Sequence, residues 1–362
     1  MNPKFHNLKV KKIIKETEDC VSIQFIVPEN LKESYQFIPG QYLTLRTIIN
    51  DEDVRRSYSI CSSGIDDDLT VAVKRVSNGK FSTFANSNLK IGDELQVLTP
   101  MGKFHSSENY NSLIKKNYVA FCSGSGITPI LSIIKAILIK EPKSSFTLFY
   151  GNQTTDSIIF RDELDALKNK HMNNLSIHYL LSKETLSSPL FCGRIDKEKC
   201  EYYFKYLINV SEVDEYFLCG PEEMIFNIKE ALNLKGVEDK KIHFELFNTD
   251  GLYVIQKINS VITNSEINDI TSNVTVILDG FTFDFKLPKS GKILDAALTN
   301  GADLPFACKG GVCCTCKAKL IEGKVSMDLN YALEKEEVEA GYILTCQSHP
   351  ITERVIVSFD EN

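Results

Sequence analysis

Four cysteines in the last sixty residues have the spacing of an iron–sulfur ligand set. Cys308, Cys313, Cys316 and Cys346 follow the pattern C-x4-C-x2-C-x29-C. This order of intervals matches the thiolates that hold a plant-type [2Fe–2S] cluster. The segment from Pro305 to Cys313 is rich in small residues, which let the backbone wrap closely and direct N–H groups at sulfur. The pattern therefore predicts a centre that carries single electrons.

Two other metal centres agree less well with this spacing. Structural zinc sites usually pair their ligands in two short spacings, and here only Cys313 and Cys316 form a C-x2-C pair. A Rieske centre takes two histidines, and Cys346 with His349 supplies only half of its pattern, because no cysteine begins a C-x-H. We keep zinc as the alternative and expect His349 to be an ordinary loop residue.

Size and composition narrow the class of protein. The chain has 362 residues, of which 43% are hydrophobic and 25% charged, enough for two or three packed domains. Its first residues lack the apolar stretch of a signal peptide, and the longest apolar run, Pro129 to Ile139, is too short to span a bilayer. We expect a cytoplasmic protein whose eleven cysteines stay reduced. The net charge of −7, without a basic stripe, argues against nucleic acid as a partner.

The periodicity of hydrophobic residues changes along the chain. Residues 1–112 contain short alternating segments broken by turn residues, which predicts an antiparallel barrel: Asp19–Val27, Gln41–Thr47, Asp68–Val76 and Glu94–Leu98. Residues 113–247 alternate between strand and helix patterns, which predicts a parallel sheet flanked by helices. Residues 248–272 are polar without a clear period, and we interpret them as a linker. In residues 273–362, Asp279-Gly280 between two apolar segments predicts a hairpin that opens a compact β-rich domain.

Two turns between a strand and a helix could bind an anion. The segment from Tyr118 to Pro129 predicts a strand, a glycine-rich turn and a helix with Thr128 at the N-cap and Pro129 at the first helical position. Such a turn directs N–H groups and the helix dipole at a phosphate. It is not the G-x-G-x-x-G pattern, because Pro129 occupies the place of the last glycine. Cys219-Gly220-Pro221 is a second turn of this kind, and each alone is also compatible with a plain connection.

Together these features resemble the ferredoxin–NADP⁺ reductase superfamily with a fused plant-type ferredoxin, over nearly the whole chain. The motifs occur in the order of that family: Pro39-Gly40-Gln41-Tyr42, Arg56-Ser57-Tyr58-Ser59, Gly79-Lys80-Phe81-Ser82, Gly124 to Pro129, Cys219-Gly220-Pro221 and the four cysteines. The resemblance implies a multidomain fold. Its domains would be an antiparallel β-barrel FAD domain (1–112), an α/β parallel-sheet nucleotide domain (113–247), a linker (248–272) and an α+β β-grasp ferredoxin domain (273–362).

The same resemblance implies which residues bind FAD. Arg56 would contact the pyrophosphate, Tyr58 the flavin ring and Ser59 the edge of the ring at N5. An Arg fork matches phosphate geometry, and a phenol offers a flat apolar face with one polar tip. Further FAD contacts would come from Ser57, Val73, Lys74, Gly79, Lys80, Phe81, Ser82 and Phe247.

For the nicotinamide nucleotide, the resemblance implies a site at the ends of the parallel strands. Thr128 and Cys219 would lie near the junction of flavin and nicotinamide, and with Ser59 they form the implied catalytic set. The pyrophosphate would lie over Gly124 and Gly126, with Gly220 and Pro221 beside it. Ser182 and Lys183 stand where many relatives use Ser-Arg to hold the 2′-phosphate of NADPH. A lysine still favours that phosphate but loses the bidentate fork, so we expect NADPH to be preferred and NADH to be possible.

The implied function is electron transfer from NADPH through FAD and the [2Fe–2S] cluster to a partner protein. The resemblance is to reductase components of phenylacetyl-CoA epoxidases and their relatives, so the expected partner is a di-iron oxygenase. A fatty-acyl desaturase or another ferredoxin-dependent acceptor is the alternative, and a non-enzymatic redox sensor is an alternative of another class. The sequence has neither an E-x-x-H nor an H-E-x-x-H motif, so we expect it to reduce an oxygenase without being one. Cys314 replaces the glycine that relatives most often have, so the reduction potential and the oxygen stability of the cluster are open to question.

Overall fold

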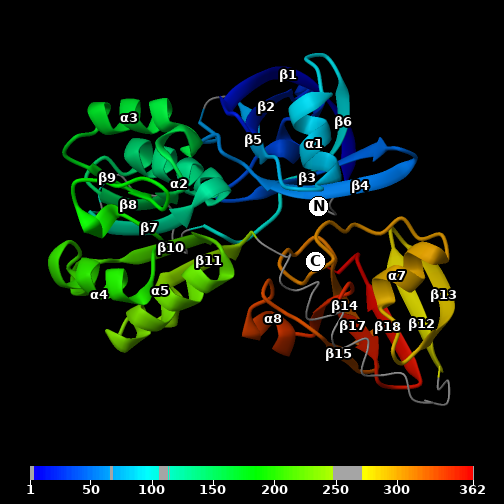
Figure 1. Cartoon of the computed structure of the whole chain (residues 1–362). Coiled ribbons are helices and arrows are strands. Elements are labelled where there is room, and N and C mark those ends of the chain that lie inside the picture. Colours follow the sequence, from blue (N-terminus) through cyan, green and yellow to red (C-terminus); the bar gives the residue numbers. More distant parts are fainter. Residues whose placement is uncertain (1–3, 66–67, 106–112, 114, 248–270, 362) are drawn as a thin grey trace. The chain divides into compact units, whose positions relative to one another are not determined.

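The computed structural model describes residues 4–65, 68–105, 113, 115–247 and 271–361. These residues form two compact units (Figure 1). Of the described residues, the first unit contains 6–54 and 58–247, and the second contains 4–5, 55–57 and 271–361. The predicted linker at 248–272 lies outside the described residues up to position 270, and strand β12 begins at Thr271.

A six-stranded sheet with the strand order β4-β3-β6-β1-β2-β5 forms the first part of the larger unit. The pairs β1–β2, β2–β5 and β3–β6 are antiparallel. Alternating side chains point into an apolar core, in which Ile23, Leu45 and Val71 have no solvent exposure. The bounds are β1 Phe5–Thr17, β2 Cys20–Ile26, β3 Tyr42–Ile49, β4 Glu52–Ser59, β5 Leu69–Lys74, α1 Lys80–Ser87 and β6 Glu94–Leu98. The antiparallel barrel is therefore confirmed, and it includes β1 and β4 besides the four predicted segments.

The second part is a five-stranded parallel sheet with the order β11-β10-β7-β8-β9. Phe149 stacks on Phe121 and on Tyr203 of α4, whereas Tyr150 packs in the core that α2 covers. Figure 1 shows α2 and α3 on one side of the sheet and α4 and α5 on the other. The bounds are β7 Asn117–Ser123, α2 Ile127–Lys140, β8 Ser145–Asn152, α3 Arg161–Lys170, β9 Leu175–Leu181, α4 Lys197–Tyr206, β10 Glu215–Gly220, α5 Glu222–Leu234 and β11 Ile242–Leu246.

This strand order determines where a ligand can bind. Starting from β7, the chain adds β8 and β9 on one side and β10 and β11 on the other. In open parallel sheets a crevice forms beyond the carboxyl ends of the strands where the order reverses. The order reverses here between β7 and β10, the strands that precede the two predicted phosphate turns, so a ligand site is expected beyond their carboxyl ends.

The start of α2 differs from the prediction. Gly126 is the N-cap, so Thr128 and Pro129 are the second and third helical residues. Thr128 is 2% exposed, and its Oγ1 donates to the carbonyl oxygen of Ser125 at 3.0 Å instead of capping an N–H group. A proline is still tolerated at this point, because the first four N–H groups of a helix have no partner within the helix.

The smaller unit is built around a mixed sheet with the order β13-β12-β18-β14-β16. Asp279 and Gly280 have φ of 50° and 77°, as a tight hairpin turn between β12 and β13 requires, and β18 pairs in parallel with β12. The core contains Cys316 and Cys346 among aliphatic side chains. The bounds are β12 Thr271–Leu278, β13 Phe281–Pro288, α7 Ile293–Thr299, β14 Lys317–Glu322, β15 Val325–Met327, α8 Lys335–Glu339, β16 Tyr342–Leu344, β17 Ser348–Pro350 and β18 Arg354–Ser358.

His349 is not the loop residue that the sequence predicted. It lies in β17, where its ring nitrogens contact the carbonyl oxygen of Gly291 and the carboxylate of Asp328, both at 3.0 Å. This histidine therefore ties β17 to two neighbouring segments. No helix in the described part of the chain is long and apolar enough to cross a membrane.

Candidate functional site

The glycine turn after β7 packs directly against the end of β10. A Cβ atom at Gly126 would lie 2.2 Å from the carbonyl oxygen of Cys219, so only glycine allows this approach. Gly124 has a φ of +55°, and a Cβ there would meet no heavy atom within 4 Å. The turn thus touches β10 on one side and leaves room above Gly124 on the other. A close backbone turn with open space at a helix N-terminus suits a pyrophosphate.

Cys219 is the next-to-last residue of β10, directly before the second turn. It has no solvent exposure and is in register with Cys122 of β7 and Glu245 of β11. Burial, with a smaller contribution from the Glu245 carboxylate, raises the pKa of the Cys219 thiol well above its ordinary value. The thiol therefore stays protonated at neutral pH, and it can act there through packing and a weak S–H donor but not as a nucleophile.

The predicted Ser59 meets a residue that the sequence analysis missed. Its Oγ donates to Oε2 of Glu245 at 3.1 Å, which joins the end of β4 to β11. Glu245 keeps some solvent exposure, yet burial of its carboxyl group raises its pKa to about 8, and the bond from Ser59 only partly offsets this. The one sequence signal was an acidic residue inside the apolar segment from His243 to Phe247. Ser59, Cys219 and Glu245 thus form one cluster beside the glycine turn.

Three of the other predicted FAD residues lie on β4, and a fourth lies just beyond β11. Tyr58 is half-buried, with its ring centroid 5.4 Å from that of Phe81. Arg56 is exposed two residues earlier on the same strand, its Nη1 donating to the carbonyl oxygen of Arg55 at 2.7 Å, and Ser57 is half-buried. Phe247, just beyond β11, is half-buried against the core that contains Cys219.

Several predicted FAD residues use their side chains within the protein. Val73 and Phe81 are core residues, and Ser82 Oγ bridges the Val76 N–H and the Gly79 carbonyl oxygen at 3.2 and 3.3 Å. Lys74 pairs with Asp19 at 3.6 Å, and Lys80 pairs with Glu52. The segment from Gly79 to Ser82 can therefore offer FAD mainly its backbone groups.

Ser182 and Lys183 are exposed at the carboxyl end of the parallel sheet. Their N–H groups donate to the carbonyl oxygens of Asn152 and Gln153 at 2.9 and 2.8 Å. The carboxylate of Glu184, a second residue missed from the sequence, accepts bonds from the N–H and hydroxyl of Thr155 at 2.6 and 2.7 Å. These bonds lower the pKa of Glu184 and keep it ionised. The backbone bond to Gln153 holds Lys183 at the sheet edge, and Lys183 makes no ion pair with any described residue.

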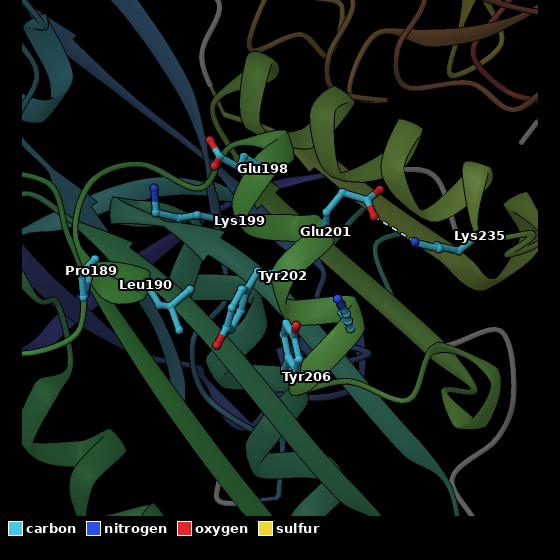
Figure 2. Close-up of a pocket in the computed structure, with 9 residues that line it drawn as sticks. Pro189, Leu190, Glu198, Lys199, Glu201, Tyr202, Tyr206 and Lys235 are labelled. Atoms are coloured by element: carbon cyan, nitrogen blue, oxygen red, sulfur yellow. Dashed lines mark ion pairs between the residues drawn. The ribbon is translucent and has the colours of Figure 1, made fainter.

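A separate cavity of about 650 Å³ lies over α4 (Figure 2). Tyr202 and Tyr206 lie side by side there with ring centroids 4.5 Å apart, and Glu201 pairs with Lys235 at 2.8 Å. No predicted site residue lines it. Its lining residues are Pro189, Leu190, Glu198, Lys199, Glu201, Tyr202, Lys205, Tyr206 and Lys235. We assign no role to this cavity.

The four predicted ligand cysteines contact one another in the smaller unit. The Sγ atoms of Cys308 and Cys313 are 3.1 Å apart, and Cys346 lies against both Cys308 and Cys316. The Gly310 N–H donates to Cys308 Sγ at 3.3 Å, and the bond from the Cys313 thiol lowers the pKa of Cys308. Among the described residues no three metal-binding side chains surround a single point. The thiols instead form a chain of contacts, which suits two irons with two thiolates each.

Cys314 bonds to another segment of the chain. Its Sγ donates to the carbonyl oxygen of Ala332 at 3.2 Å, on the segment between β15 and α8. The side chain that replaces glycine here is therefore used to anchor a neighbouring loop.

Family models match three successive parts of the chain. The model described as an oxidoreductase FAD-binding domain matches residues 7–106, an oxidoreductase NAD-binding domain matches residues 121–230, and a 2Fe-2S iron-sulfur cluster binding domain matches residues 276–350. Their order agrees with the order of the two parts of the larger unit and of the smaller unit.

Curated relatives match along their full length. The chain is 45% identical to one subunit of 1,2-phenylacetyl-CoA epoxidase from Escherichia coli (strain K12), over 98% of both chains. It is 34% identical to the ferredoxin reductase component of 3-ketosteroid-9-alpha-monooxygenase from Rhodococcus rhodochrous, over 97% of this chain and 96% of that one.

Solved structures share the fold at lower identity. Phthalate dioxygenase reductase matches with a TM-score of 0.57 and 21% identity over 98% of both chains. An intact type IV self-sufficient cytochrome P450 monooxygenase matches with a TM-score of 0.67 and 20% identity, over 98% of this chain and 41% of that chain. At these identities the two matches show that the chain shares their fold. The chain therefore belongs to the family of flavin- and iron–sulfur-dependent reductase components that includes the matching subunit of 1,2-phenylacetyl-CoA epoxidase.

Proposed function

We propose that this chain is the reductase component of a di-iron 1,2-phenylacetyl-CoA epoxidase, to which it passes electrons from NADPH through FAD and a [2Fe–2S] cluster. The observation that carries this proposal is the likeness to one subunit of that enzyme from end to end of both chains. Specificity for an acceptor protein depends on the whole surface, so a match limited to one domain would not have supported it.

The barrel offers a fitting site for FAD. In the proposed arrangement the Arg56 guanidinium holds the pyrophosphate, Tyr58 packs against the flavin ring and Phe247 covers it. Arg56 and Tyr58 are two residues apart on β4, so their side chains lie on the same face of the strand. Both have exposed surface that a ligand could cover. Backbone groups of Val73, Lys74 and the segment from Gly79 to Ser82 complete the contacts.

The crevice between β7 and β10 positions the nicotinamide nucleotide. Backbone N–H groups at Gly124 and Gly126 bind the pyrophosphate, while Gly220 and Pro221 border it. Thr128 and Cys219 limit the space for the nicotinamide, and their burial excludes water from that point. At neutral pH the Glu245 carboxyl is mainly protonated, so the Ser59–Glu245 pair can hold a proton beside the flavin without placing a charge there.

The cofactors supply the redox chemistry when bound: NADPH gives a hydride, flavin accepts two electrons and releases them one at a time, and the cluster carries single electrons. The chain's contribution is to hold them in a fixed order and to exclude water. Cys308, Cys313, Cys316 and Cys346 are the proposed ligands of the cluster.

We further propose a preference for NADPH over NADH and a cytoplasmic location. Lys183 supports the preference, because its backbone is bonded at the sheet edge and its exposed side chain makes no ion pair in the described chain. All eleven cysteines are free in the described structure, which suits a reducing compartment. The 3-ketosteroid relative favours a second candidate function, in which the acceptor is a different oxygenase.

The purified protein should contain FAD and a red-brown cluster and should reduce cytochrome c faster with NADPH than with NADH. With the oxygenase components of the Escherichia coli epoxidase added, NADPH should drive consumption of phenylacetyl-CoA. The measurements are the visible spectrum, cytochrome c reduction and loss of phenylacetyl-CoA. Cytochrome c reduction without consumption of phenylacetyl-CoA would favour another acceptor, and bound cofactors without any turnover would favour a redox sensor.

Lys183→Ala should raise KM for NADPH by roughly tenfold and change KM for NADH little, because only NADPH carries the 2′-phosphate that the ammonium group holds. Steady-state cytochrome c reduction with both nucleotides measures this. Lys170→Ala, which removes an exposed lysine at the end of α3, is the matched control. An equal effect of Lys183→Ala on both nucleotides would contradict the assignment.

Glu245→Gln should remove a pH dependence of folding stability. The folded pKa of about 8 lies above the unfolded value of 4.5, so the native state binds the proton more tightly. The folding stability that this tighter proton binding contributes is fully present below pH 4.5 and is lost as pH rises through 8. Because Glu245 is partly exposed, we expect a loss of roughly 1–3 kcal/mol relative to Glu245→Gln. Urea denaturation from pH 5 to 9, followed by flavin fluorescence, measures it, with exposed Glu94→Gln as control. A constant difference between wild type and Glu245→Gln would refute the buried neutral carboxyl.

Cys308→Ala should abolish the visible absorbance of the cluster, whereas Cys314→Ala should retain it. The reason is geometric: the Cys308 thiol contacts the other ligands and the Cys314 thiol bonds to Ala332. Absorbance spectra and iron content per chain measure both variants. An intact spectrum in Cys308→Ala would overturn the ligand assignment, and loss in Cys314→Ala would show that the fifth thiol is needed.

A further inference from the structure

We propose that Gln347 is a positioning residue for the iron–sulfur cluster, because its side-chain amide orients the peptide group that donates a hydrogen bond to the Cys308 sulfur. This inference rests on the proposed function of the four cysteines as ligands. Gln347 directly follows Cys346, has no solvent exposure and was not singled out from the sequence.

The amide nitrogen of Gln347 connects the first and the fourth ligand segments. Nε2 donates to the carbonyl oxygen of Lys309 at 2.8 Å and to that of Cys346 at 3.0 Å. A third and longer contact joins Nε2 to Cys346 Sγ at 3.7 Å, so the two N–H groups of the amide are shared among acceptors on both ligand segments. One side chain thus holds the residue after Cys308 to the backbone of Cys346.

The contact with Lys309 fixes the direction of a neighbouring N–H group. The carbonyl of Lys309 and the N–H of Gly310 belong to the same peptide unit, which is planar and trans, so the two groups point in opposite directions. Because the oxygen is held by Gln347, the hydrogen is directed the other way, and the Gly310 N–H lies 3.3 Å from Cys308 Sγ. The amide of Gln347 and the sulfur of Cys308 therefore bind opposite ends of one rigid group.

This peptide would not keep its orientation without support. Lys309 has a φ of 51°, a left-handed conformation that is unfavourable for a residue with a side chain. Gly311 has a φ of +74°, and a Cβ there would lie 2.8 Å from the Leu329 carbonyl oxygen and 3.2 Å from Cγ of Gln347. The ligand loop is thus wrapped tightly around Gln347 and is held in a strained form at Lys309.

The amide oxygen of Gln347 indicates that the side chain serves as a hydrogen-bond donor. Oε1 of Gln347 is buried and has no hydrogen-bond partner among the described residues. Turning the amide over would set this oxygen against two carbonyl oxygens, so its orientation follows from the partners. A buried unpaired acceptor is unfavourable, and an apolar side chain of the same length would avoid it. The chain nevertheless places a donor between the two carbonyls.

The consequence concerns the cluster rather than the fold. Hydrogen bonds to sulfur raise the reduction potential of iron–sulfur clusters, and groups behind the ligands affect how firmly the metal is held. Without the amide the Lys309 peptide can rotate, and the bond to Cys308 Sγ is weakened. The potential should then become more negative and the cluster should be lost more readily.

Gln347→Met, with similar length and no donor, tests this in the full chain. We expect a more negative midpoint potential in redox titrations and roughly tenfold faster loss of visible absorbance in the presence of a chelator. Ser348→Ala is the matched control, because it removes a neighbouring buried hydroxyl that donates to the Leu344 carbonyl oxygen at 2.8 Å and does not touch the ligand loop. Its potential and its rate of cluster loss should equal those of the wild type.

Unchanged potential and cluster lifetime in Gln347→Met would overturn the positioning role and leave the proposed function intact. Absence of cluster absorbance in the wild type would instead refute the proposed function. If Gln347→Met cannot be isolated with a cluster, Gln347→Asn decides, because it keeps the amide. Cluster retained in Gln347→Asn and Ser348→Ala supports the inference, whereas loss in both shows a general sensitivity to packing and overturns it.

Discussion

The close approach of the Gly124–Gly126 turn to the end of β10 is the constraint on which the nucleotide site depends. No side chain fits between Gly126 and the Cys219 carbonyl, so the start of α2 packs with its backbone directly against the end of β10. The same contact sets the position of Cys219, whose register with Glu245 places that carboxyl within reach of Ser59. A larger residue at Gly126 would separate the pyrophosphate turn from the residues that surround the nicotinamide.

The helix that begins at this turn also joins the nucleotide domain to the barrel. Ser132 Oγ donates to the Ser62 carbonyl oxygen at 2.6 Å, and Lys135 Nζ donates to that of Cys61 at 3.3 Å. Both acceptors lie just beyond β4, the strand that carries Tyr58 and Ser59. Rigid attachment of this kind fixes the distance between two bound cofactors, which is the main contribution that a protein makes to hydride and electron transfer.

In the smaller unit, a strained backbone and a buried amide hold the site. The ligand loop carries left-handed residues at Lys309 and Gly311 and is held through a peptide group by Gln347, while the Cys314 thiol bonds to Ala332. A neutral donor can direct backbone N–H groups at sulfur without adding a charge near the cluster. Hydrogen bonds between domains in the larger unit and a buried amide in the smaller one therefore each give a redox centre a fixed environment.

The amino-acid sequence by itself determined the features that depend on neighbours in the chain. Four such features are patterns of nearby residues: the cysteine spacing, the glycine turns, the Asp279-Gly280 hairpin and the change from alternating to strand–helix periodicity. The structure confirms the three kinds of fold that they predicted. The start of α2 was mispredicted because the Thr128 hydroxyl donates to the Ser125 carbonyl oxygen instead of capping the helix. The strand at His349 was mispredicted because the partners of that ring, Gly291 and Asp328, are brought near only by folding. Glu245 lies 186 residues from Ser59 and Gln347 lies 38 residues from Lys309, so the sequence around each did not show what it bonds to. Only the tertiary structure decided their roles, since the partner that gives each polar side chain its orientation or its pKa is brought near by folding.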